Sequence, residues 1–353
     1  MKTYNELKLA QELIRFPTVK TEDKGIIKFL SKKLSSIGFK CIVIKSKGTD
    51  VKPALNLYAK FGNSKPHINF LGHTDVVANL SNWKIPPFKG VIRKGYLNGR
   101  GSQDMKGGIA CFISAISNFI KNEKFQGSIS IIIAADEETT GLGTPAIIKY
   151  LKRRAEKIDF SIIAEPSSNK SIGDEIRIGR RGSMNGIITV NGKSGHSAFY
   201  GSYINPCTAL AKIITKLKST SLDTGTKFMP QSNLEFTKIN VENLSENVVP
   251  QSISAKFNVR FNSKHKSSSL KKKLNKIINT VAKKGKCKTK IEYKVSGEAF
   301  YTNPNREIYM VKKIVKKVTG NSAKLNCRGG TSDSRFLGSI PRLELGLKNN
   351  TIH

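Results

Sequence analysis

Histidine and acidic side chains follow three apolar segments of this chain, each of which has the pattern of a β-strand. The carboxyl ends of neighbouring parallel strands share one edge of a sheet, so we expect these side chains to lie close together there. Asp104 adds a further acid, because it occupies a glycine-rich loop directly before a predicted helix. The side chains that follow the three strands are His73, Asp75, Asp136, Glu137, Glu138 and Glu165.

This set of side chains is suited to binding metal ions, because zinc takes imidazole nitrogen and carboxylate oxygen as ligands. Two zinc ions about 3.5–4 Å apart can share a bridging carboxylate, and Asp104 is a candidate for that role. Asp75 lies two residues after His73 on the same side of the strand, where its carboxylate can orient the imidazole. Of the adjacent acids Glu137 and Glu138, one can bind metal while the other stays free as a general base.

Each of these residues also has a structural interpretation. A histidine at a strand end is commonly a hydrogen-bonded core residue, two adjacent glutamates are commonly solvated, and a glutamate before a proline is commonly part of a turn. If these residues had unrelated structural roles, however, the three strand ends and the Asp104 loop would seldom all place such side chains at one edge of a sheet. We therefore favour a metal centre over separate structural roles.

The elements that must position these residues alternate between helix and strand in the first half of the chain. Segment 128–135 contains three consecutive isoleucines and no polar alternation, which is typical of a strand buried on both faces. Segments 54–61 and 67–71 are predicted to pair with each other around a turn at residues 62–66. The alternation predicts an α/β fold with a mostly parallel central sheet. The other predicted elements are strands at 39–44 and 159–164, an amphipathic helix within residues 1–16, and helices at 25–34, 105–120 and 144–157.

The middle of the chain has a different pattern, in which strands accompany two amphipathic helices. It predicts an α+β domain over residues 181–292 that is inserted into a catalytic domain formed by residues 1–180 and 293–353. The catalytic domain then resumes with a helix at 307–319 and ends with a strand at 342–346. The elements predicted in the inserted domain are strands at 181–190, 233–241 and 252–261 and helices at 206–218 and 267–283.

Composition excludes several classes of protein. The chain has 353 residues, a length typical of two domains, and 61 Lys+Arg against 25 Asp+Glu give a net charge of +36. Of these 61 basic residues, 48 are Lys spread over the whole chain, whereas nucleic-acid binding typically relies on clustered Arg with aromatic residues. No apolar stretch has the length of a membrane span or the character of a signal peptide. The five cysteines are scattered, without a CxxC motif, so we expect a protein of the reducing cytoplasm that binds neither membrane nor nucleic acid.

Longer motifs surround the candidate ligands. Segments 71–77 (LGHTDVV) and 99–108 (GRGSQDMKGG) are followed in order by the Asp-Glu-Glu and Glu-Pro motifs. On these motifs the chain resembles the M20 family of dinuclear zinc peptidases and deacylases, from about residue 7 to residue 353. Segments 179–183 (GRRGS), 296–302 (SGEAFYT) and 329–336 (GGTSDSRF) resemble, more specifically, the succinyl-diaminopimelate desuccinylases within that family.

The resemblance implies a zinc-peptidase-like catalytic domain with two zinc ions per subunit, cobalt being possible at one site. It implies that His73, Asp104 and Glu165 hold one ion, and that Asp104, Glu138 and His353 hold the other. Members of the family usually continue past the last of these histidines, so we expect an ion bound through His353 to be held less tightly.

The resemblance also implies catalytic roles. Glu137 would be the general base and Asp75 the acid that orients His73. His196 would reach the active site of a partner subunit and bind the oxyanion there, which implies a homodimer formed through the inserted dimerisation, or lid, domain.

The implied reaction is hydrolysis of N-succinyl-LL-2,6-diaminopimelate to succinate and LL-2,6-diaminopimelate by a metal-bound hydroxide, a step in lysine and diaminopimelate biosynthesis. The substrate carries three carboxylates, which arginine binds in bidentate fashion. Two alternatives remain open: another M20 deacylase, such as acetylornithine deacetylase or an aminoacylase, and an inactive basic binding protein. The residues that the resemblance assigns to substrate binding are Arg180, Asn247, Arg260, Gly330, Thr331 and Asn349.

Overall fold

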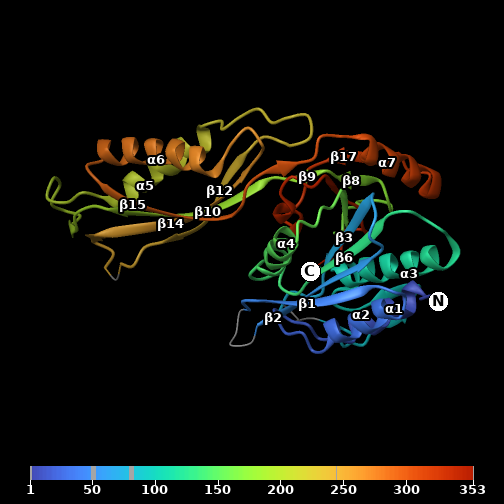
Figure 1. The fold of residues 1–353 in the computed structure, drawn as a ribbon. Coiled ribbons are helices and arrows are strands. Elements are labelled where there is room, and N and C mark those ends of the chain that lie inside the picture. The colour runs from blue at the N-terminus through green and yellow to red at the C-terminus, as the bar shows by residue number, and fades with distance from the viewer. Residues whose placement is uncertain (1, 49–52, 79–82, 244, 353) are drawn as a thin grey trace. The chain divides into compact units, whose positions relative to one another are not determined.

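The computed structural model of the chain describes residues 2–48, 53–78, 83–243 and 245–352. It divides into two compact units, which we describe separately (Figure 1). Unit 1 comprises Met1–Ile178, Thr302–Asn326 and Ser332–His353, and unit 2 comprises Gly179–Tyr301 and Cys327–Thr331. Within the described residues, no helix combines the length and the apolar character that a membrane crossing requires.

Unit 1 is built on an eight-stranded sheet. Its four central strands, β6, β3, β7 and β18, run parallel to one another. Strands β6, β3 and β7 are mostly apolar and buried, as is typical of strands covered on both faces, whereas β18 is buried although Arg342 and Glu344 are charged. The predicted α/β class with a mostly parallel central sheet is therefore confirmed. In spatial order the strands are β1 (Lys40–Ser46), β2 (Ala54–Phe61), β6 (Ser128–Ala134), β3 (His67–His73), β7 (Phe160–Ile163), β18 (Arg342–Glu344), β8 (Glu175–Arg177) and β17 (Lys324–Asn326).

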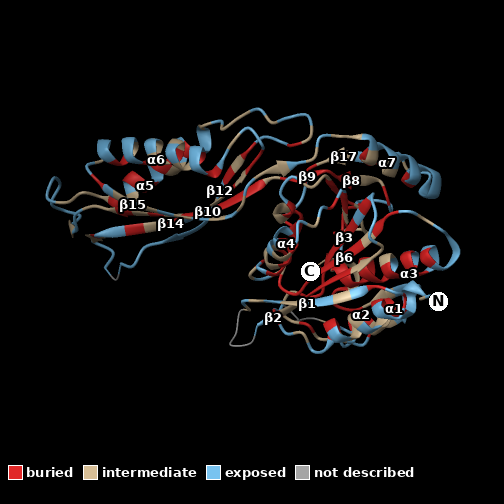
Figure 2. Ribbon diagram, viewed as in Figure 1, coloured by how far each residue is buried: buried red, intermediate tan, exposed pale blue. Residues whose placement is uncertain are grey.

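One predicted strand pairing is wrong. Strands β2 and β3 do not pair around residues 62–66, because β6 lies between them and pairs antiparallel with β2 and parallel with β3. The isoleucine-rich strand β6 is buried on both faces, and a central position in the sheet provides that burial. Figure 2 shows the buried residues concentrated along β3 and β6.

The helices of unit 1 bury one apolar side each against the core. In α3, for example, Ile109, Ile113 and Ile116 are buried at helical spacing, and Phe112 stacks on Phe70 of β3 with ring centroids 4.0 Å apart. Helix α4 is shorter than predicted and stops at Arg153. The helices are α1 (Glu6–Ile14), α2 (Ile26–Ser35), α3 (Gly107–Asn122), α4 (Gly143–Arg153) and α7 (Arg306–Thr319), and a small hairpin joins β4 (Val91–Arg93) and β5 (Tyr96–Asn98).

Unit 2 consists of a four-stranded antiparallel sheet and two helices, which share one apolar core. Strand β14 alternates between buried and more exposed residues, so one face of the sheet packs on the helices. Strand β15 continues through residue 293, which was the predicted domain boundary, and pairs with β10 as far as Gly297. The sheet strands are β12 (Asn233–Asn240), β14 (Ser252–Phe261), β10 (Gly182–Asn191) and β15 (Lys288–Gly297), the helices are α5 (Pro206–Ser219) and α6 (Ser267–Lys284), and the short strands are β9 (Gly179–Arg180), β11 (Gly195–His196), β13 (Val248–Val249) and β16 (Phe300–Tyr301).

Candidate active site

The acids and the histidine predicted to meet at one sheet edge do so in unit 1. His73 is the last residue of β3, while the Asp-Glu-Glu turn directly follows β6 and Glu165 follows β7. Because β6, β3 and β7 are neighbouring parallel strands, their carboxyl ends open onto the same edge.

His73 lies at the centre of this cluster and is buried. Its Nε2 atom is 3.1 Å from Asp104 Oδ1 and 3.8 Å from Glu165 Oε1. Burial alone would lower the pKa of His73, but hydrogen bonds to Asp104 and Asp75 outweigh burial and raise that pKa well above its ordinary value. A metal cation on Nε2 would take the place of the proton directed at Asp104, while Nδ1 would keep its proton toward Asp75.

Asp75 has two structural functions in the site. Its carboxylate Oδ1 and its backbone oxygen lie 3.5 and 3.1 Å from His73 Nδ1. The same carboxylate accepts hydrogen bonds from the backbone nitrogens of Glu137, at 3.0 Å, and Glu138, at 2.9 Å. Asp75 therefore fixes the histidine and the turn that carries both glutamates.

Asp136 holds the same turn from its other side. Its carboxylate accepts hydrogen bonds from the backbone nitrogens of Leu142, at 2.9 Å, and Gly143, at 2.8 Å, at the start of α4. The backbone nitrogen of Ala135 donates to Asn56 Oδ1 at 3.0 Å. Through these hydrogen bonds the buried Asp136 stabilises the turn, while Glu137 and Glu138 are partly exposed.

The donor set fits divalent metal. Ligand atoms of His73, Asp104 and Glu165 lie within 4.8 Å of one another, and so do those of His73, Glu137 and Glu138. Burial and the neighbouring carboxylate of Glu165 raise the pKa of Glu137 well above its usual range, although His73 opposes the shift. Buried carboxylates crowded around one imidazole are suited to zinc, which binds oxygen and imidazole nitrogen and would offset the repulsion between them.

Lys106 anchors the loop that carries Asp104. Asp104 and Met105 have non-helical backbone angles within the one-turn π-helix η1 (Ser102–Lys106), so α3 begins only at Gly107, two residues after the predicted start. The fully buried Lys106 donates from Nζ to the backbone oxygen of Phe16 at 2.7 Å, and burial lowers its pKa to about 7. Lys106 belongs to the GRGSQDMKGG motif of residues 99–108, but the sequence alone did not indicate its anchoring contact.

Unit 2 contains most of the residues predicted to bind substrate. His196 is exposed, and its Nε2 lies 3.1 Å from Asn247 Nδ2 while its Nδ1 accepts a hydrogen bond from Ala198 N. Arg180 is buried and donates to the backbone oxygen of Gly330 at 3.1 Å, next to Thr331. Arg260 lies separately on β14, where its Nε donates to Asn258 Oδ1 at 3.1 Å.

Two predicted residues lie near the end of the chain. Asn349 belongs to unit 1, and its backbone nitrogen donates to Ser168 O at 2.9 Å. His353, the predicted ligand of the second ion, lies outside the described residues.

Two acids that had not been assigned a role are buried in the same unit. Asp333 Oδ2 accepts a hydrogen bond from Thr144 Oγ1 at 2.7 Å, and the pKa of Asp333 is raised to about 6, chiefly by burial. Glu344 ends β18, the neighbour of β7, and accepts from the hydroxyls of Ser332 and Ser334. Asp333 stands in the GGTSDSRF motif, which was the available sequence signal, whereas Glu344 follows the same strand-end rule as Glu165.

Comparison with known proteins places the chain in a family. A sequence model of peptidase family M20/M25/M40 matches residues 70–353. The succinyl-diaminopimelate desuccinylase of Pelagibacter ubique is 48% identical, with 100% of this chain and 93% of that protein covered. The desuccinylase of Ehrlichia canis is 43% identical, with 98% of this chain and 91% of that protein covered.

Solved structures share the fold at lower sequence identity. A tripeptidase from Staphylococcus aureus superposes with a TM-score of 0.81 at 20% identity, covering 100% of this chain and 92% of that one. Human carnosine dipeptidase 1 gives a TM-score of 0.70 at 17% identity, and the match covers 97% of this chain and 88% of that one. With the family match, these relatives confirm the resemblance found in the sequence motifs: the chain belongs to peptidase family M20/M25/M40 and groups within it with the succinyl-diaminopimelate desuccinylases.

Proposed function

We propose that this chain hydrolyses N-succinyl-LL-2,6-diaminopimelate to succinate and LL-2,6-diaminopimelate, in the cytoplasm. The observation that carries the proposal is the metal-suited cluster around His73 in a chain that is 48% identical over its full length to a desuccinylase. The cluster supplies the chemistry of amide hydrolysis, and the likeness to the desuccinylases selects the substrate.

In this proposal His73, Asp104 and Glu165 hold one zinc ion, and Asp104 and Glu138 contribute to a second together with His353. Such ions polarise an amide carbonyl and lower the pKa of water toward about 7. The donor set around His73 supports the first site directly, since all three ligand atoms lie within 4.8 Å of one another.

Glu137 would act as the base. Its carboxylate takes a proton from the attacking water, and it later gives that proton to the amine nitrogen as the carbon–nitrogen bond breaks. Hydrolysis thus consumes one water and releases succinate and the free amine. Burial and the carboxylate of Glu165 raise the pKa of Glu137, and a more basic carboxylate takes a proton from water more readily.

We also propose that unit 2 forms a homodimer and that His196, with Asn247, serves the site of the partner subunit. The exposure of His196 and the hydrogen bond that its Nδ1 accepts from Ala198 N support this role. With Nδ1 as the acceptor, the neutral ring carries its proton on Nε2, which is then the nitrogen that donates to an oxyanion. Arg180, Arg260, Gly330, Thr331 and Asn349 remain the proposed substrate-binding residues.

The proposal is tested by measuring succinate release from N-succinyl-LL-2,6-diaminopimelate by the zinc-loaded chain, beside acetate release from N-acetylornithine under the same conditions. We expect a much larger kcat/KM for the succinylated substrate. Preferential hydrolysis of N-acetylornithine would instead assign the chain to another deacylase activity of the family.

A further inference from the structure

Arg335 lies beside Glu137 and has no role in the function described so far. Its Nη1 atom is 3.8 Å from Glu137 Oε1. Within the described part of the chain, no Lys or other Arg side chain forms an ion pair with Glu137. Arg335 is therefore the fixed cationic neighbour of the proposed base.

Neighbouring residues in unit 1 fix the position of this guanidinium group. Its central carbon lies 4.3 Å from the centre of the Phe336 ring, and its Nη2 is 3.9 Å from Asp333 Oδ1. Asp333 is itself held by the hydroxyl of Thr144. Gly141 leaves the necessary space, since a Cβ atom at that position would lie 2.7 Å from Arg335 Nη2.

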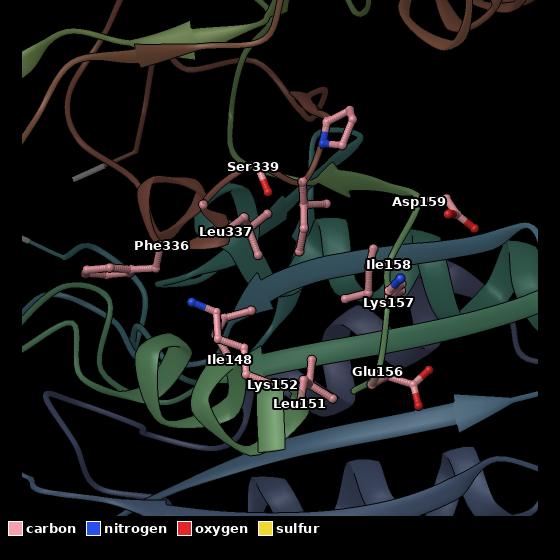
Figure 3. A pocket seen from close by; sticks show the side chains of 13 residues that line it. Ile148, Leu151, Lys152, Glu156, Lys157, Ile158, Asp159, Phe336, Leu337 and Ser339 are labelled. Atoms are coloured by element: carbon pink, nitrogen blue, oxygen red, sulfur yellow. The ribbon is translucent and has the colours of Figure 1, made fainter. Parts of the chain in front are cut away.

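Phe336 can be altered without touching the acid cluster. Phe336 and Leu337, at the end of the 3₁₀ helix η2 (Asp333–Leu337), line a cavity of about 400 Å³ together with Ile148 and Leu151 of α4 (Figure 3). The cavity lining contains neither Glu137 nor any proposed metal ligand. A smaller side chain at position 336 would remove part of the ring contact that holds the Arg335 guanidinium.

Glu137 needs a partner of this kind. One of its ligand atoms lies within 4.8 Å of those of His73 and Glu138, so the Glu137 carboxylate could itself coordinate an ion in the cluster. A base that coordinates metal through both oxygens cannot accept a proton, and the two adjacent glutamates would then lose their separate roles.

We propose that Arg335 is a positioning residue, which holds the Glu137 carboxylate as a base and disfavours its coordination to metal. This inference rests on the proposed hydrolase function. Arg335 acts through Glu137 and takes no part in bond making or breaking. Asp333 and Phe336 flank the guanidinium in this position, Thr144 holds Asp333, and Gly141 leaves the space that the guanidinium occupies.

The test compares Arg335→Met, Arg335→Lys and Phe336→Leu with the wild-type enzyme. We expect Arg335→Met to lower kcat for the succinylated substrate by about 10–100-fold while KM and bound metal stay nearly constant, because a misplaced base affects the chemical step. The kcat values of Arg335→Lys and Phe336→Leu should lie between those of Arg335→Met and wild type. Guanidinium ion added to Arg335→Met should restore part of the lost kcat. Arg154→Met is the matched control, since Arg154 also stacks on an aromatic ring, that of Tyr150 at 4.6 Å, but at the far end of α4.

A second readout does not depend on turnover. In cobalt-loaded protein, release of Glu137 onto the metal should change the visible absorption of Arg335→Met but not that of Arg154→Met. An unchanged cobalt spectrum with unchanged kcat would overturn the role of Arg335, and a change confined to KM would make it a substrate contact instead. A wild-type enzyme without desuccinylase activity would refute the proposed function, while the cobalt spectra would still decide the role of Arg335.

Discussion

The side chains of Asp223 in unit 2 and Asp333 in unit 1 are 5% and 4% exposed, but Asp333 is enclosed more deeply and has fewer hydrogen-bond donors around it. Asp223 accepts hydrogen bonds from Gly225 N at 2.7 Å and from Ser232 N at 3.3 Å, and also from Asn262 Nδ2. Burial raises the pKa of Asp223, but these hydrogen bonds outweigh burial and lower it to about 2. Burial raises the pKa of Asp333 to about 6, because the Thr144 hydroxyl and Arg335 only partly oppose it.

The difference separates a structural acid from an acid in the candidate active site. Hydrogen-bond donors satisfy Asp223, which thereby joins its loop to the end of β14. Burial instead raises the pKa of both Asp333 and Glu137, and Glu137 also faces the carboxylate of Glu165; acids with pKa values raised in this way are typical of sites that bind cations or move protons.

The largest effect is expected from metal removal. Chelation should abolish amide hydrolysis, and added zinc or cobalt should restore it, because the cluster around His73 is suited to metal and Asp223 is not. The measurement is succinate release before and after dialysis against a chelator. Full activity in protein shown to be metal-free would contradict the account.

Glu137→Gln should lower kcat by about 10²–10⁴-fold, since the amide cannot act as a base. Zinc content should stay at the wild-type level. Glu138→Gln is the matched control and should lose zinc instead. Loss of zinc in Glu137→Gln, with little change in turnover per bound ion, would mean that the roles of the two glutamates are exchanged.

His196→Ala should lower kcat by about 10²–10³-fold if the imidazole donates to an oxyanion. Zinc content should not change, because His196 belongs to unit 2 and the proposed ligands belong to unit 1. Mixing this variant with an inactive Glu137→Gln chain should recover activity in mixed dimers. Absence of recovery from verified mixed dimers would argue against a role for His196 in the partner subunit.

Asp223→Ala should reduce the free energy of unfolding by about 1–3 kcal/mol, because it leaves buried donors without an acceptor. Zinc content and kcat per folded molecule should be unaffected. The folded-state pKa is below the ordinary value, so the stabilisation is present above about pH 4 and is lost as pH falls toward 2. Denaturant unfolding between pH 3 and pH 7 should therefore show a flatter profile for the variant than for wild type.

The smallest effect concerns Asp333→Asn in metal-free protein. The folded-state pKa of Asp333 is raised to about 6, so the folded state binds more protons than the unfolded state between about pH 4 and pH 6. This residue therefore makes wild type less stable as pH rises through that range, and the variant should lack that contribution. If the free energy of unfolding has the same dependence on pH in both proteins, the pKa of Asp333 is not raised in the folded state.

The strand ends that carry His73, Glu137 and Glu165 could be predicted from the sequence, because the carboxyl ends of neighbouring parallel strands lie at the same edge of a sheet. The pairing of β2 with β3 was predicted from their closeness along the chain and was wrong, since β6 competes for both partners. Arg335 was missed for the same reason: only the folded chain brings it to Glu137. Local patterns predict elements well, whereas long-range neighbours depend on the sheet order.

Zinc binding by wild type and His73→Ala, measured by equilibrium dialysis with Asp223→Asn as the control, decides whether the metal centre lies at this cluster. We expect wild type and Asp223→Asn to bind zinc equally, and His73→Ala to lose the tight site formed with Asp104 and Glu165. Undiminished zinc binding by a folded His73→Ala protein would contradict the assignment of the metal centre to this cluster.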